Sequence, residues 1–64
     1  MKENIGKNAG LIWQALKSGE KEVKALKRNT KLKERDLNLA LGWLARESKI
    51  NFREDAVGSY VSLA

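Results

Sequence analysis

The side chains that could do chemistry in this chain are few, and they do not combine into a catalytic site. The 64 residues contain no histidine and no cysteine, which removes the usual nucleophile–base pairs, disulfides and zinc clusters. Two acidic pairs, Glu20 with Glu22 and Glu54 with Asp55, are expected to be exposed carboxylates beside lysines or in a turn. No glycine-rich phosphate loop occurs. The sequence therefore predicts a non-enzymatic protein without a metal, a cofactor or a small-molecule substrate.

Positive charge is concentrated in the middle of the chain. The net charge is +5, from 13 Lys and Arg residues against 8 Asp and Glu residues. Residues 17–35 hold eight basic residues and three acids, and the remainder holds five of each, so the whole excess lies in this segment. A localised basic segment is typical of a protein that binds a polyanion. The alternative is a lysine-rich helix surface that is merely solvated.

Two polar residues near the start of a predicted helix have the chemistry to read DNA bases. Arginine can bond guanine bidentately and asparagine can do the same with adenine, which suits Arg35 and Asn38. Phosphate contacts that fix the register would come from the basic residues just before them. These are Lys24, Lys27, Arg28, Lys31 and Lys33. The alternative is that Arg35 and Asn38 are simply exposed.

The spacing of apolar residues defines the elements that must position these side chains. The predicted elements are helices over about residues 5–17, 22–28 and 33–48, followed by a β-hairpin over about residues 50–63. Asn4 is the expected N-cap of the first helix, and Gly19 is suited to end it. Alternation of Ile50 and Phe52 with polar neighbours indicates the first strand of the hairpin.

The size of the chain limits its stability. We expect a single domain over residues 1–64, and a domain this small buries only roughly 60% of the surface of its unfolded chain. Without disulfides or metals, self-association is the remaining way to stabilise it. No apolar run approaches the roughly 20 residues of a membrane span, and the N-terminus lacks a signal-peptide core. We therefore expect a cytoplasmic protein.

The order of the elements resembles that of the winged helix-turn-helix superfamily, a mostly helical α+β fold of three helices followed by a β-hairpin wing. The stretches that carry the resemblance are AGLIWQAL, EVKALKRNTKL, LALGWLARESKI and INFREDAVGSYVSL. More closely, the chain resembles a family of very small bacterial winged-helix proteins of uncharacterised function, in which LALGWLARE recurs. The resemblance implies the winged-helix fold and homodimers, and it is compatible with either DNA binding or protein interaction.

Several positions depart from the superfamily pattern. Lys21 and Glu22 stand where an apolar residue and a capping residue are usual before the second helix, so the small strand expected there would be short or absent. Lys33 replaces a capping Ser or Thr at the start of the third helix. Glu54 and Asp55 at the wing tip would repel phosphates, which makes the wing a poor candidate for contact with the DNA backbone.

The third predicted helix carries more apolar residues than one face requires. Its inward stripe is predicted to be Leu37, Ala40, Leu41, Leu44 and Ala45. Leu39 and Trp43 lie on the opposite side, one turn apart, next to Gly42. The hairpin could cover them, they could form a homodimer interface with Gly42, or they could contact bases. Trp13 lies on the inward face of the first predicted helix and is expected in the protein core.

These observations favour a DNA-binding, transcription-related winged-helix protein that forms a homodimer. The alternative is a winged-helix module for protein–protein interaction or dimerisation without DNA binding. The first hypothesis makes the basic segment the binding surface, and the second makes the pair Leu39 and Trp43 the binding surface.

Overall fold

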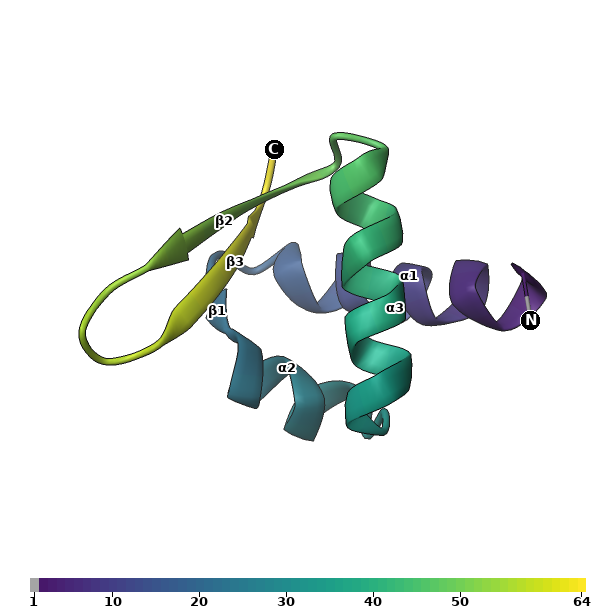
Figure 1. The fold of residues 1–64 in the computed structure, drawn as a ribbon, viewed down its shortest axis with the longest axis horizontal. Coiled ribbons are helices and arrows are strands. Elements are labelled where there is room, and N and C mark those ends of the chain that lie inside the picture. The colour runs from purple at the N-terminus through teal and green to yellow at the C-terminus, as the bar shows by residue number, and fades with distance from the viewer. Residues whose placement is uncertain (1) are drawn as a thin grey trace.

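The computed structural model describes the backbone of residues 2–64 and the side chains of residues 4–64. The helices and strands follow one another as α1 (Lys2–Leu16), β1 (Lys21–Glu22), α2 (Val23–Thr30), α3 (Glu34–Arg46), β2 (Ile50–Glu54) and β3 (Ser59–Leu63). This is the predicted mostly helical α+β arrangement, with three helices followed by a hairpin (Figure 1).

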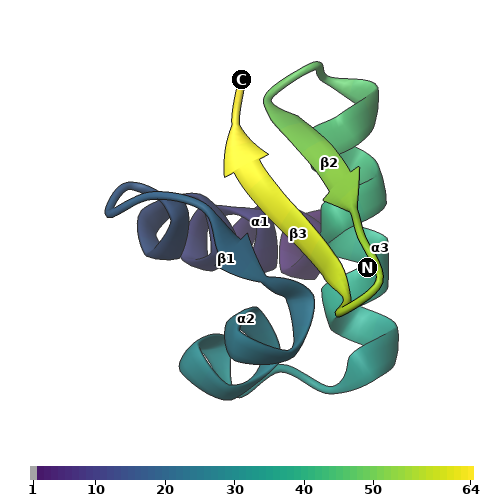
Figure 2. The same cartoon turned by 90° about the vertical axis from the view of Figure 1, so that its left-hand side faces the viewer.

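The core lies where α3 crosses α1, with β3 against α1 and α2 and β2 beside the end of α3 (Figures 1 and 2). Its buried residues are Ala9, Ile12, Leu16, Leu26, Leu37, Ala40, Leu41, Leu44, Ile50 and Val61. Ala45 was predicted to be inward but is exposed, because the four buried residues of α3 already form its whole inward face. Trp13 was also predicted in the core, but it is 38% exposed, because Ile12 occupies the centre of the inward face of α1.

The short strand before α2 does form, despite its charged sequence. β1 pairs antiparallel with β3, with Lys21 opposite Val61 and Glu22 opposite Tyr60, which gives the strand order β1-β3-β2. Charged residues can form this strand because the pairing uses backbone groups and does not require apolar side chains. In Figure 2, β3 lies between its two neighbours and β1 leads directly into α2.

The helix ends differ from the predicted caps in one place. α1 begins at Lys2, so Asn4 lies inside the helix and the prediction that it is the N-cap is wrong. The other end agrees better, because the Gly19 N–H donates to the Leu16 carbonyl at 3.0 Å with a φ of +124°, which favours glycine. α3 starts after Lys33 with no side-chain cap, as its sequence implies.

The wing is the β2–β3 hairpin, in which Ile50 is opposite Leu63 and Phe52 is opposite Val61. Its tip is closed by Asp55, whose carboxylate accepts the backbone N–H groups of Val57 at 2.8 Å and Gly58 at 3.1 Å. These two bonds are the main cause of the lowered pKa of Asp55. The turn at the wing tip is therefore closed by hydrogen bonds to its own acid.

Candidate nucleic-acid and protein interfaces

The predicted phosphate-contacting residues occupy the outside of the helix-turn-helix. Lys24, Lys27 and Arg28 project from α2, and Lys31 and Lys33 from the turn that follows, and all five are exposed. α2 is oriented by Leu26, which is completely buried and leaves the charged sides of the helix in solvent. We call these five residues together with Arg35 the basic flank.

The basic flank is not neutralised by neighbouring acids within residues 4–64. Both ion pairs found there use Arg53 of the wing, and none uses a residue of the basic flank. Six exposed cations within twelve residues, from Lys24 to Arg35, thus remain available to a polyanion.

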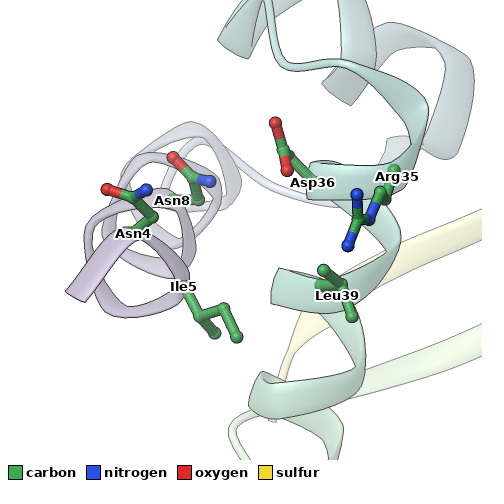
Figure 3. A pocket seen from close by; sticks show the side chains of 6 residues that line it. All are labelled: Asn4, Ile5, Asn8, Arg35, Asp36 and Leu39. Carbon is green, nitrogen blue, oxygen red and sulfur yellow. The ribbon is translucent and has the colours of Figure 1, made fainter. Parts of the chain in front are cut away.

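The two predicted base-reading residues are both exposed, but they border different hollows. Arg35 lines a cavity of about 150 Å³ between α1 and α3, where Figure 3 shows it on α3 near Leu39, with Ile5 of α1 opposite. Asn38 lines a separate cleft beneath the wing. Both side chains lie in the first half of α3, the part of a recognition helix that meets base edges.

Leu39 and Trp43 are exposed at 42% and 41%, so the hairpin does not cover them. Of the three alternatives for these residues, the one in which the hairpin covers them is therefore wrong. The reason lies in the burial of Ile50 and Val61, which draws the sheet to the opposite, inward side of α3. Gly42 between them is also exposed, with nothing outside its own helix within 4 Å of where a Cβ would stand.

A second tryptophan, which the sequence predicted in the core, faces the same side of the molecule. Trp13 and Trp43 line one groove of about 420 Å³ between α1 and α3, with Gly6 and Gly10 on its α1 side. The Lys17 ammonium lies 4.4 Å from the centre of the Trp13 ring. The signal was present in the spacing of Gly6, Gly10 and Trp13 at i, i+4 and i+7, which places them on one face of α1.

The wing differs from the basic flank because its one central cation is engaged. The Arg53 guanidinium donates to both carboxylate oxygens of Glu20, at 3.1 and 2.8 Å, and to Asp55 at 3.0 Å. It also lies 4.3 Å from the centre of the Tyr60 ring. The hydrogen bond from Arg53 is the main cause of the lowered pKa of Glu20. Arg53 therefore ties the wing to the segment before β1 and offers little free charge to DNA.

Neither a membrane-spanning helix nor a metal-ligand cluster is found within the part of the chain that the structure describes. No helix there is both long and apolar enough to span a bilayer, and no three metal-ligating side chains come together.

A tri-helical body with a β-hairpin that follows the third helix, and a short strand before α2, defines a winged helix-turn-helix. The chain belongs to the family described as winged helix-turn-helix domain (DUF2582), whose model matches residues 1–63. It is also similar to the solution NMR structure of protein BT2368 from Bacteroides thetaiotaomicron, with 32% identity and a TM-score of 0.85 over 97% of this chain and 77% of that chain. No curated protein matches. The predicted fold class and family resemblance are confirmed.

Proposed function

We propose that this protein is a non-enzymatic, transcription-related protein that binds double-stranded DNA through its helix-turn-helix. The observation that carries the proposal is the basic flank, with six exposed cations on α2, the turn and the start of α3 and no ion pair among them within residues 4–64. Neutralising phosphates with such residues releases counterions and drives binding.

The proposed docking places the start of α3 in the major groove. Arg35 and Asn38 would face base edges there, while Lys24, Lys27 and Arg28 contact the phosphates that border the groove. Glu54 and Asp55 would keep the wing tip away from the backbone. The wing is therefore not part of the proposed interface.

The test is binding of the whole chain to duplex DNA over a salt series. Log K is expected to fall with log salt with a slope of about −3 or steeper, because each phosphate contact contributes about −0.9. Undetectable binding at low salt, or an affinity that does not change with salt, would overturn the proposal.

Homodimerisation is a second proposed property, favoured by the exposure of the apolar strip. Leu39, Gly42 and Trp43 would form the interface, together with the groove that contains Trp13. A two-fold interface must be complementary to itself, and this face carries both a projecting tryptophan and an open recess at Gly10. Tryptophan is also a favoured anchor in interfaces.

Sedimentation equilibrium of Trp43→Ala tests this interface. The variant is expected to be monomeric at concentrations where the parent chain is dimeric. Its association free energy should be weaker by at least about 2 kcal/mol, the value typical of an interface hot spot. Phe52→Ala is a matched control, because Phe52 is 53% exposed but lies on the wing. A parent chain that is monomeric at every concentration, or a folded Trp43→Ala dimer, would contradict the proposed interface without affecting the DNA proposal.

A further inference from the structure

A cleft beneath the wing is separate from the groove that contains the tryptophans and shares one lining residue, Lys24, with the basic flank. Its volume is about 510 Å³, and Val23, Leu41, Phe52 and Val57 supply its apolar surface. The hairpin projects beyond the helices on this side (Figure 1). We call it the wing cleft.

The exposure of Phe52 shows that the wing cleft is an extension of the core without a covering element. Side chains two residues apart point to the same face of a strand, so Phe52 shares a face with Ile50. Ile50 is 5% exposed, whereas Phe52 is 53% exposed and Val57 is 79% exposed. The apolar face of β2 therefore continues past the point where the helices cover it.

The side chains that line the wing cleft carry a net negative formal charge, whereas the chain as a whole is positive. Glu22 and Glu34 line it against the single cation Lys24, and neither carboxylate is in an ion pair within residues 4–64. The Glu22 carboxylate is seated against Gly58, where an added Cβ would lie 2.9 Å from its Oε2 atom. Glycine at this position thus leaves room for a carboxylate at the edge of the cleft.

We propose that the wing cleft binds a hydrophobic organic monoamine. Its ammonium would lie between the Glu22 and Glu34 carboxylates, and its apolar body would lie against Leu41 and the Phe52 ring. The volume falls within the roughly 300–1,000 Å³ of small-molecule sites. The two carboxylates and one ammonium among the lining side chains give a formal charge of −1, so one positive charge on the ligand matches the cleft better than two.

The test is a titration of the whole ¹⁵N-labelled chain, without DNA, with 4-phenylbutylamine as the probe. The matched compounds 4-phenylbutanol and 4-phenylbutyrate have the same apolar body with no charge and with a negative charge. Chemical shift changes are expected at Phe52, Val57 and Asn38, and the amine is expected to bind about fivefold or more tightly than the alcohol, the effect of one partly exposed charge pair. An amine that binds no more tightly than the alcohol would overturn the proposal.

Two variants complete the test. Glu34→Gln should reduce the affinity for the amine by about threefold to fivefold and leave that for the alcohol unchanged. Glu34 is exposed at the start of α3 and is in no ion pair within residues 4–64, so this variant is expected to fold. Glu47→Gln is the control, since Glu47 is exposed beyond the end of α3 and does not line the cleft. Equal losses in both variants, or shift changes centred on Trp13 and Trp43, would contradict the assignment of the ligand to the wing cleft.

Discussion

The basic flank and the wing both carry charged side chains on short exposed elements, but they use them in opposite ways. In the wing, Arg53 contacts Glu20, Asp55 and the Tyr60 ring, so its charge holds the structure together. In the basic flank, six cations lie within twelve residues without an ion pair among residues 4–64. The comparison shows that exposed charge can serve two ends: the cation of the wing is used within the fold, whereas those of the basic flank remain unpaired among residues 4–64.

The largest expected effect is on stability, because the basic flank is anchored by a buried side chain and the wing tip is not. Leu26 is completely buried and is the main anchor of α2, so Leu26→Ala is expected to cost about 2–5 kcal/mol of unfolding free energy. Phe52→Ala in the wing should cost far less, because about half of its side chain is already in solvent. Thermal and urea unfolding followed by circular dichroism would measure both. Similar losses for the two variants would mean that the wing is packed as firmly as the flank.

A smaller effect concerns the charges that close the wing. The pKa values of Glu20 and Asp55 are lowered in the folded chain from ordinary values of 4.5 and 3.8. A lowered pKa means that the ionised acid stabilises the fold above its unfolded pKa, and that this stability is lost as the pH falls through the folded value. The melting temperature should therefore decrease as the pH is lowered below about 4.5.

Arg53→Ala tests this expectation further, because it removes the guanidinium that lowers the pKa of Glu20. The variant should lose the part of the pH dependence that comes from Glu20. It should keep most of the part from Asp55, because the backbone N–H groups of Val57 and Gly58 are the larger causes of that lowered pKa. Melting temperatures over an acid pH series measure the difference. An unchanged pH profile would show that the Arg53 pairs do not contribute in solution.

Most of the fold could be predicted from the sequence because its signals are local. The helical spacing in α3 and the alternation from Ile50 to Phe52 depend on residues close together in the chain. The prediction failed where the outcome depends on distant packing. Trp13 and Ala45 are exposed because other residues fill the inward faces of their helices, and no local pattern contains that information.

The candidate sites were predictable to different degrees. The exposed basic flank follows from composition and from one buried residue in α2, so its side chains lie in solvent as expected. The groove that contains Trp13 and Trp43 joins two helices that are far apart in sequence. Similarly, the wing cleft brings Glu22, Glu34 and Phe52 together from three elements. Such combinations depend on how the helices cross and where the hairpin projects, which the sequence pattern alone does not fix.

The most direct test of the account compares the salt dependence of DNA binding in two variants that lose the same charge. Lys27→Ala removes one exposed cation from the basic flank, and Lys7→Ala removes one exposed cation from α1, outside the flank and outside the groove that contains the tryptophans. A DNA site on the helix-turn-helix predicts that Lys27→Ala lowers the magnitude of the slope of log K against log salt by about 0.9, and that Lys7→Ala keeps the slope of the parent chain. Equal changes in both variants would show that binding follows net charge alone, which would contradict a DNA site on the helix-turn-helix.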